Sequence, residues 1–189
     1  MTKDKRIPTQ GEMTKDKGQM NISNDPNNDN NKHDYFVLFE VGGTTYGVRA
    51  LMVQQMEMLD RITRVPNTIE FVEGVVFSRG QVIPAINLRV RFGLEKIPYD
   101  SRTRLLVIKT EARGELPGSR NVDGRLESGR TVGLIADTAR EFVSIPLDAV
   151  QKPSEGLLAA TNCLDGIARL GDRTVLILNM EELLNSHAV

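Results

Sequence analysis

The residues that most often carry out chemistry in proteins are few in this chain and far apart. It has one cysteine, Cys163, and two histidines, His33 and His187, near opposite ends. A serine or cysteine nucleophile needs a base nearby, usually histidine, and a structural zinc site needs several cysteine or histidine ligands. Neither set is present in the sequence, so we expect no catalytic centre, cofactor or metal site. Cys163 cannot form an intramolecular disulfide, and we interpret it as a small buried hydrophobic residue.

The motifs of the common catalytic classes are also absent from the sequence. There is no Gly-x-Ser-x-Gly, His-Glu-x-x-His, Walker or Gly-x-Gly-x-x-Gly pattern. Acidic residues are plentiful, but none forms an isolated pair on an apolar strand. Asp137 follows the apolar run that ends at Ala136, and a role in a turn is the simpler interpretation for it. These observations favour a binding protein and argue against an enzyme.

The charge balance and the aromatic content argue against nucleic acid as the partner. The chain has 24 basic and 25 acidic residues, a formal net charge of -1, 5% aromatic residues and no tryptophan. Nucleic-acid-binding domains usually carry a basic excess, and single-stranded nucleic acid usually stacks on several aromatic side chains. Small β-barrels nevertheless often serve this role, so a small-barrel nucleic-acid-binding protein remains the alternative function.

The sequence gives no indication of a membrane-spanning segment. No apolar run approaches the 18 or so residues that a span needs, and no apolar signal-peptide core follows the charged start at Lys3 to Arg6. We therefore expect a cytoplasmic protein without direct membrane insertion.

Two segments are too polar to form a buried hydrophobic core. Residues 1–34 are rich in asparagine and poor in apolar side chains, which predicts a disordered tail. Residues 110–130 carry five glycines or prolines among charges of both signs, which predicts a long mobile surface insertion between two strands. Such an insertion is either functional or merely tolerated, and we favour the second.

The body between these segments shows the period of two that is typical of strands. Alternate residues from Val82 to Phe92 are apolar, which predicts a strand with that face buried and with Arg89 and Arg91 on a solvated face. Pro84 cannot donate a ladder hydrogen bond and indicates an edge or a bulge. Further strands are expected at 36–41, 45–48, 105–109, 131–136, 141–145 and 174–178, with hairpin turns at 42–43 and 171–172. Helical turns are expected at 66–71 and 146–150, and a helix at 180–186. Residues 51–58 could form either a helix or a strand.

The body also repeats itself weakly but in a constant order. Four segments of the first half are echoed in the second: 45–48 by 131–134, 62–66 by 142–146, 74–76 by 166–168, and 86–88 by 178–180. Two similar β-subdomains of about five strands each would explain this order, and units of that size close best as small barrels. We expect residues 35–95 and 102–185 to form two barrels that pack together, because either alone would be marginally stable.

One segment is specific enough to indicate a family. Residues 74–89 read Gly-Val-Val-Phe-Ser-Arg-Gly-Gln-Val-Ile-Pro-Ala-Ile-Asn-Leu-Arg and resemble the signature of CheW-like domains. The similarity extends over residues 35–185 and includes the following motifs: Tyr46-Gly47-Val48, Val65-Pro66, Phe71-Val72-Glu73-Gly74, Gly133-Leu134-Ile135-Ala136-Asp137, and the ending from Leu176 to Leu184.

This resemblance implies a fold and a function. The fold would be mostly β, with two packed SH3-like five-stranded barrels, a short C-terminal helix and the disordered tail. The protein would be a non-catalytic adaptor, recruited to arrays at the inner face of the membrane in chemotaxis or a related motility pathway. Its partners would be the cytoplasmic tip of methyl-accepting chemoreceptors and the regulatory domain of a CheA-type histidine kinase, which has the same fold.

The resemblance also implies a partner-binding site, formed by Val53, Gln55, Arg79, Gly80, Val82 and Pro84. The family pattern has Asn-Leu where this chain has Phe77-Ser78, and often has glutamate at Gln55, so Arg79 would lack an ion-pair partner here. Gly80 is expected in a turn with positive φ. Met52, Met56 and Met58 would form either an adaptable partner surface or part of the core.

Overall fold

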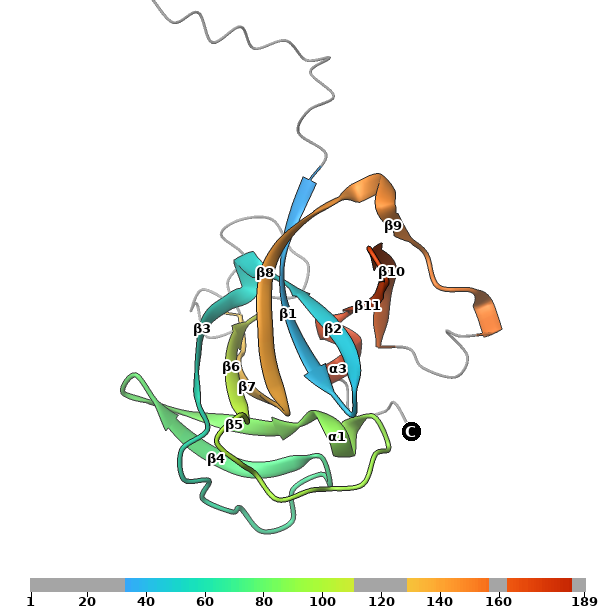
Figure 1. The fold of residues 1–189 in the computed structure, drawn as a ribbon. Helices are drawn as coiled ribbons and strands as arrows, with labels where there is room; N and C mark the ends of the chain where they lie inside the picture. The colour runs from blue at the N-terminus through green and yellow to red at the C-terminus, as the bar shows by residue number, and fades with distance from the viewer. Residues whose placement is uncertain (1–32, 111–128, 157–162, 185–189) are drawn as a thin grey trace, which may run out of the picture. The chain divides into compact units, whose positions relative to one another are not determined.

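The computed structural model describes residues 33–110, 129–156 and 163–184, and nearly all of the predicted tail and insertion lies outside these ranges (Figure 1). The last two residues that we assigned to the tail, His33 and Asp34, instead begin strand β1 (His33–Val41), where they pair with Pro146 and Ile145. In the described residues, the body therefore begins two residues earlier than expected.

The described residues form two sheets, which we call sheet A and sheet B. Sheet A has the strand order β8-β1-β2-β11-β10-β9 and sheet B has the order β3-β6-β7-β5-β4. Besides β1, sheet A consists of β2 (Thr44–Arg49), β8 (Thr138–Pro146), β9 (Val150–Gln151), β10 (Leu164–Leu170) and β11 (Arg173–Leu178). Sheet B consists of β3 (Val53–Met58), β4 (Val72–Ser78), β5 (Gln81–Asn87), β6 (Arg104–Lys109) and β7 (Thr131–Ala136). Short helical turns are η2 (Ala50–Met52), α1 (Leu88–Arg91), η3 (Leu147–Ala149) and α3 (Met180–Leu184).

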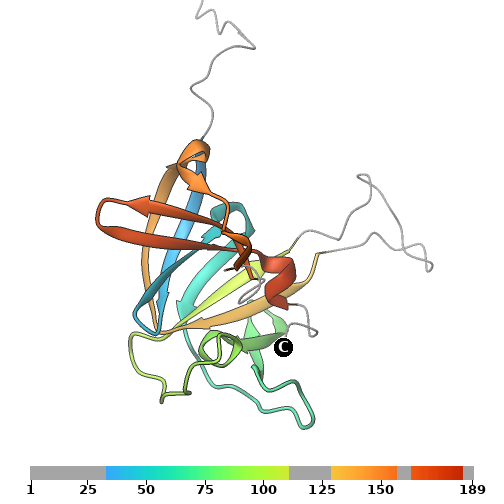
Figure 2. The same cartoon turned by 90° about the vertical axis from the view of Figure 1, so that its right-hand side faces the viewer.

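The sheets do not divide where the sequence repeat suggested. We expected 35–95 and 102–185 to form separate barrels, but β1 and β2 lie in sheet A with β8 to β11, and β6 and β7 lie in sheet B with β3 to β5. The parallel pairs β2–β11 and β5–β7 make these joins, and the β10–β11 hairpin is seen in red in Figure 2. A repeat shows which segments are alike. It does not show whether a hairpin pairs within its own half or is exchanged with the other half, because both arrangements satisfy the same apolar pattern.

The repeat itself is present in the structure, at equivalent positions of the two sheets. Gly47 of β2 lies opposite Ile177 of β11, and Gly133 of β7 lies opposite Ala85 of β5. Both pairs lie between parallel strands. Gly133 is the echo of Gly47, and Ile177 stands directly before segment 178–180 as Ala85 stands directly before segment 86–88. The exchange of hairpins is therefore symmetric between the halves.

The same polar arrangement also occurs twice. The Nδ2 of Asn87 donates to Glu73 Oε1 at 2.7 Å, and the Nδ2 of Asn179 donates to Asp165 Oδ1 at 2.7 Å. Each acid is the extra residue of a β-bulge, at the register shifts in β4 and β10. Each asparagine oxygen also accepts from the backbone N–H three residues on, at 3.2 Å and 3.0 Å. These asparagines therefore act as N-caps of α1 and α3.

The strand expected from Val82 to Phe92 is shorter, and of the residues expected on its buried face only Ile86 and Leu88 are fully buried. It ends at Asn87, whose cap begins α1, and Val82 is 66% exposed while Ile83 and Ala85 are buried. Both faces of this strand carry apolar residues at its start, so alternation could not select the buried one. Pro84 lies just beyond the ladder with β7, which begins at Ala85, so it interrupts no hydrogen bond there.

Most of the other local predictions are confirmed. The six remaining expected strands and both glycine turns are present, 146–150 contains η3, and 51–58 contains the end of η2 followed by β3. The chain turns at 66–71 without a helix, and 62–66 is a loop with one bridge, Thr63 to Val75, whereas its echo lies in β8. No helix in the described ranges is long and apolar enough to cross a membrane.

Three apolar clusters hold the sheets together. One lies within sheet A, one within sheet B, and the largest contains residues of both. Leu105 and Leu106 are successive in β6 and point to opposite faces, so Leu105 joins the cluster of sheet B and Leu106 joins the shared cluster. Burial of each stabilises the fold by roughly 1.5–3 kcal/mol. Cys163 is buried in the shared cluster, as predicted. The result is two barrel-like subdomains packed together, with the shared cluster between them.

Candidate partner-binding surface

The tip of the β4–β5 hairpin is a tight turn with an unusual backbone. Ser78 pairs with Gln81, and the two residues between them, Arg79 and Gly80, have φ angles of 46° and 81°. Positive φ at both central positions is the signature of a type I′ turn. Gly80 has the predicted positive φ, which costs glycine little free energy. For a non-glycine residue such as Arg79, a positive φ costs roughly 1–3 kcal/mol of conformational free energy. Strain of this kind often accompanies a functional position.

An apolar pair flanks the turn on the outside of sheet B. Phe77 and Val82 lie directly opposite each other on the two strands, and they are 70% and 66% exposed. Exposed aromatic and aliphatic side chains beside an arginine are a common composition for protein–protein interfaces. Pro84 continues the same face of β5 and is half-buried.

A side-chain hydrogen bond joins the two edges of sheet B below this turn. Gln55 of β3 donates through Nε2 to Ser78 Oγ at 2.5 Å and to Glu57 Oε2 at 2.9 Å. Because β3 and β4 are the opposite edges of the sheet, this contact closes the sheet on itself. Gln55 is therefore brought next to Arg79, as the resemblance implied. Val53 is not, since its side chain packs against the shared cluster.

A small polar cleft lies between these edges. It has a volume of about 210 Å³ and is lined by Gln54, Gln55, Ser78, Arg79, Gln81, Ile83, Val107 and Thr131. Arg79 is the only charged residue of this lining, and no salt bridge joins it to a carboxylate within the described residues. The cleft is thus a neutral polar recess beside one exposed guanidinium, which can receive a carboxylate or carbonyl oxygen.

The outer face of β3 adds methionines to this surface. Gln55 points to the inside of sheet B, so its neighbours Met56 and Met58 alternate outward, and both are exposed. Met52 packs against the shared cluster. Of the two interpretations of these methionines, exposure therefore holds for Met56 and Met58, and core packing holds for Met52. We call Met56, Phe77, Arg79 and Val82 the tip surface.

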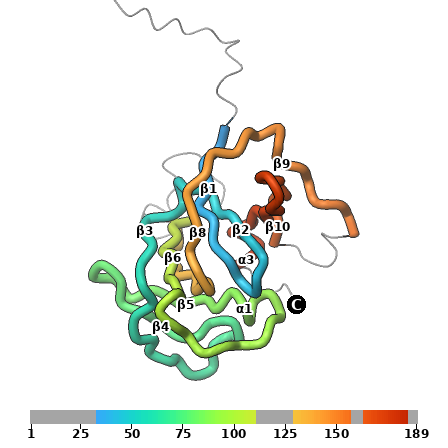
Figure 3. The backbone as a smooth tube through the Cα atoms, viewed as in Figure 1, coloured from blue at the N-terminus to red at the C-terminus, as the bar shows by residue number. Residues whose placement is uncertain are grey.

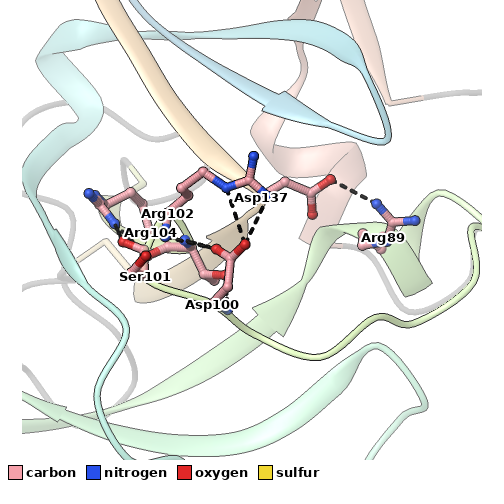
Figure 4. A network of polar contacts seen from close by, with 7 residues as sticks. Arg89, Asp100, Ser101, Arg102, Arg104 and Asp137 are labelled. Atoms are coloured by element: carbon pink, nitrogen blue, oxygen red, sulfur yellow. Dashed lines mark hydrogen bonds and ion pairs between the residues drawn. The ribbon is translucent and has the colours of Figure 1, made fainter.

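Sequence reasoning missed an ion pair that connects the two sheets. Arg89 was expected on a solvated face, but its Nη1 lies 2.7 Å from Asp137 Oδ2, and the two side chains are only 18% and 26% exposed (Figure 4). The same carboxylate oxygen accepts from the backbone N–H of Gly42 at 2.8 Å. Arg89 Nε donates to the carbonyl of Glu95 at 2.7 Å. This Arg89–Asp137 clasp joins α1 to the β1–β2 turn and to the end of β7.

Arg91 was also predicted to be solvated, and it is not. Its guanidinium donates to the carbonyls of Leu183 at 2.8 Å and Glu182 at 3.0 Å, and lies 5.2 Å from the ring centre of Phe71. It thereby holds the last turn of α3 against α1. Periodicity placed both arginines opposite an apolar face and assumed a strand. The only sequence signal for their roles was their position in the short segment that follows Asn87, which caps α1.

Within the described residues, no group of three or more histidine, cysteine or carboxylate side chains is placed to hold a metal ion. The chemistry of the tip surface and of its cleft is that of recognition, through an exposed cation, amide and hydroxyl groups and apolar side chains.

Comparisons with known proteins agree on one family. The model of the CheW-like domain matches residues 35–188. Chemotaxis protein CheW of Klebsiella aerogenes is 30% identical over 152 residues, covering 80% of this chain and 81% of that protein. Chemotaxis protein CheW of Helicobacter pylori is 30% identical over 156 residues, covering 82% and 84%. Protein FrzA of Myxococcus xanthus is 27% identical over 153 residues, covering 80% and 85%. The solved scaffolding protein TtCheW of Thermoanaerobacter tengcongensis has a TM-score of 0.66 and 25% identity, covering 82% of this chain and 89% of that one.

Proposed function

This chain belongs to the CheW-like family and is a coupling adaptor of a chemotaxis-type signalling pathway, and we propose that it joins a chemoreceptor to a CheA-type histidine kinase. It does so without catalysis of its own. An adaptor changes the activity of a kinase by binding the kinase's conformational states unequally, so its output is the geometry of the complex. The protein acts in the cytoplasm and is recruited to receptor arrays at the inner face of the membrane.

The tip surface is the part of the molecule that contacts the receptor in this proposal. The observation that carries it is Arg79, held at φ 46° on a turn between the exposed Phe77 and Val82. The cytoplasmic tip of a chemoreceptor is a helical hairpin, and helices bind partner proteins through apolar anchors with polar contacts at the rim. Phe77 and Val82 supply the apolar contact, and Arg79 supplies the rim contact.

The other predicted site residues have supporting roles. Gly80 allows the turn, Pro84 extends the apolar face of β5, and Gln55 holds Ser78 and so positions the turn from across the sheet. Val53 acts indirectly, through the packing of β3 against the shared cluster. The binding contact is thus concentrated on the turn and its two flanking residues.

The second partner is the regulatory domain of the kinase, and a bridging experiment tests both partners at once. Kinase is mixed with receptor-bearing vesicles, and the vesicles are sedimented with and without the purified full-length chain. We expect the kinase to sediment in quantity only when the chain is present, because an adaptor must contact both partners together. Kinase recovery that is independent of the chain would remove the coupling role, and binding of one partner alone would reduce the protein to a ligand of that partner.

A further inference from the structure

A second and larger cavity lies apart from the tip surface and shares no lining residue with the cleft beside Arg79. Its volume is about 400 Å³, and it lies between residues 60–64, the bulge of β4 and residues 96–99. The last of these segments belongs to the return from α1 to β6, which Figure 3 traces in green. Cavities of this size are typical of sites for small molecules.

A hydrogen-bonded network forms one wall of the cavity. Glu73 accepts from Asn87 at 2.7 Å and pairs with Lys96 Nζ at 2.5 Å, and Asn87 also donates to the hydroxyl of Tyr99 at 3.1 Å. Burial disfavours ionisation of Glu73, but hydrogen bonds from Lys96, Asn87 and Tyr99 outweigh it and hold its pKa below the usual range. The buried carboxylate in the described lining of this cavity is therefore ionised and already paired with Lys96, which weakens its repulsion of an anionic ligand.

The rim of the cavity carries two cations that have no such partner among the described residues. Arg61 and Arg64 form no salt bridge with any described residue, and both are exposed. Asp60 also lies on the rim, where its carboxylate accepts from the backbone N–H of Arg61. The lining as a whole has three cationic and two anionic side chains, which leaves an excess of one positive charge. Two guanidiniums are well suited to a carboxylate or a phosphate, because both groups accept paired hydrogen bonds from arginine.

The remaining lining is apolar and partly exposed. It consists of Ile62, Ile97, Pro98 and the ring of Tyr99, and Ile97 and Tyr99 are 42% and 38% exposed. In the second copy of the repeat, Asn179 and Asp165 take the places of Asn87 and Glu73. No described cation forms a salt bridge with Asp165. The capping motif therefore does not need Lys96 or Tyr99, and these residues of the first copy are additions to it.

We propose that this cavity binds a small molecule in which one carboxylate or phosphate group is attached to an apolar body. The anionic group lies between Arg61 and Arg64 at the rim, and the apolar body lies against Ile62, Ile97 and the ring of Tyr99. A ligand of this class would act on the adaptor at a place separate from the receptor contact proposed for the tip surface.

The test uses the full-length chain, with phenyl phosphate and benzoate as the two probes and phenol and inorganic phosphate as half-ligands. Binding is followed by the NMR shifts of backbone amides. We expect saturable shifts at residues 60–64 and 96–99 with at least one of the two probes, and at least tenfold weaker binding of each half-ligand. The probe that binds more tightly distinguishes a phosphate from a carboxylate ligand.

A pair of variants decides whether the effect is specific. The double variant Arg61→Ala, Arg64→Ala should weaken binding of the probe at least tenfold without unfolding the chain, since neither guanidinium forms a salt bridge with any described residue. The control Arg169→Ala removes an exposed arginine of β10 and should leave binding unchanged. The proposal is overturned if neither probe saturates, if the shifts scatter over the surface, or if the double variant binds as the wild type does. Binding of an acidic peptide in the absence of probe binding would likewise overturn it, in favour of a protein contact.

Discussion

The Arg89–Asp137 clasp makes a quantitative prediction about stability. Asp137→Ala removes the ion pair to Arg89 and the hydrogen bond from Gly42, and leaves a largely buried guanidinium without its carboxylate. A hydrogen bond to a charged group contributes roughly 1.5–3 kcal/mol, so two fully buried bonds would contribute about 3–6 kcal/mol, and partial exposure of both side chains lowers this sum. We expect the free energy of unfolding to fall by about 2–3 kcal/mol. For a chain of this size that corresponds to a fall in Tm of about 4–12 °C.

A double-mutant cycle isolates the ion pair from the other contacts. Urea unfolding of Arg89→Ala, Asp137→Ala and the double variant should give a coupling energy of roughly 1–2 kcal/mol. The matched control is Arg173→Ala, which removes an arginine from an ion pair with Glu141 that is exposed to solvent. A coupling energy near zero, or an equal loss of stability in the control, would refute the view that this clasp holds the two sheets together.

Two further predictions concern the bulge of β4. Gly74 has φ 143°, and a Cβ there would lie 2.1 Å from the carbonyl oxygen of Thr63, so Gly74→Ala should cost roughly 3 kcal/mol or more in urea unfolding. Gly171→Ala, at φ 58° with open space around it, should cost only about 1 kcal/mol, and equal costs would contradict the steric argument. Glu73 has a folded-state pKa below its ordinary value of 4.5, so its contribution to stability is present above that pH and is lost as the pH falls through the folded-state pKa. In acid titrations of stability, Glu73→Gln should lack this part of the pH dependence, and an unchanged profile would show that the network does not hold the carboxylate ionised.

The sequence predicted the local elements of this fold better than their assembly. Short β-rich runs, glycine turns and the two-copy pattern follow from local chemistry, and the structure contains them. The exchange of β1–β2 and β6–β7 between the sheets could not be predicted, because either pairing buries the same residues. At the start of β5 the predicted face was wrong for a related reason, since Val82 and Ile83 are equally apolar, and only the cluster of sheet B selects Ile83. Further along the strand Ile86, on the predicted face, is buried in the shared cluster.

The candidate site shows the same division. Arg79, Gly80 and Val82 could be predicted to lie together because the turn is continuous in sequence, and Gln55 was predicted only through the family resemblance. Arg89 and Asp137 are 48 residues apart, and nothing in periodicity indicates that they meet. Charged residues that pair across elements were interpreted as solvated, which is the common state of an arginine but not the state of Arg89 or Arg91.

The central claim concerns Arg79, and its most direct test is kinase phosphorylation in mixtures of receptor, kinase and full-length adaptor. Arg79→Ala should fold as the wild type does, because no ion pair or helix depends on this side chain among the described residues. It should weaken each contact with the receptor by about 1–3 kcal/mol, or roughly fivefold to 150-fold, and so abolish most receptor-dependent kinase activation. Arg79→Lys should restore only part of it, because an ammonium group does not reproduce the planar fork. Arg169→Ala, near the turn of the equivalent hairpin β10–β11, should couple as the wild type does. Wild-type activation by Arg79→Ala, or an equal loss in Arg169→Ala, would contradict the account.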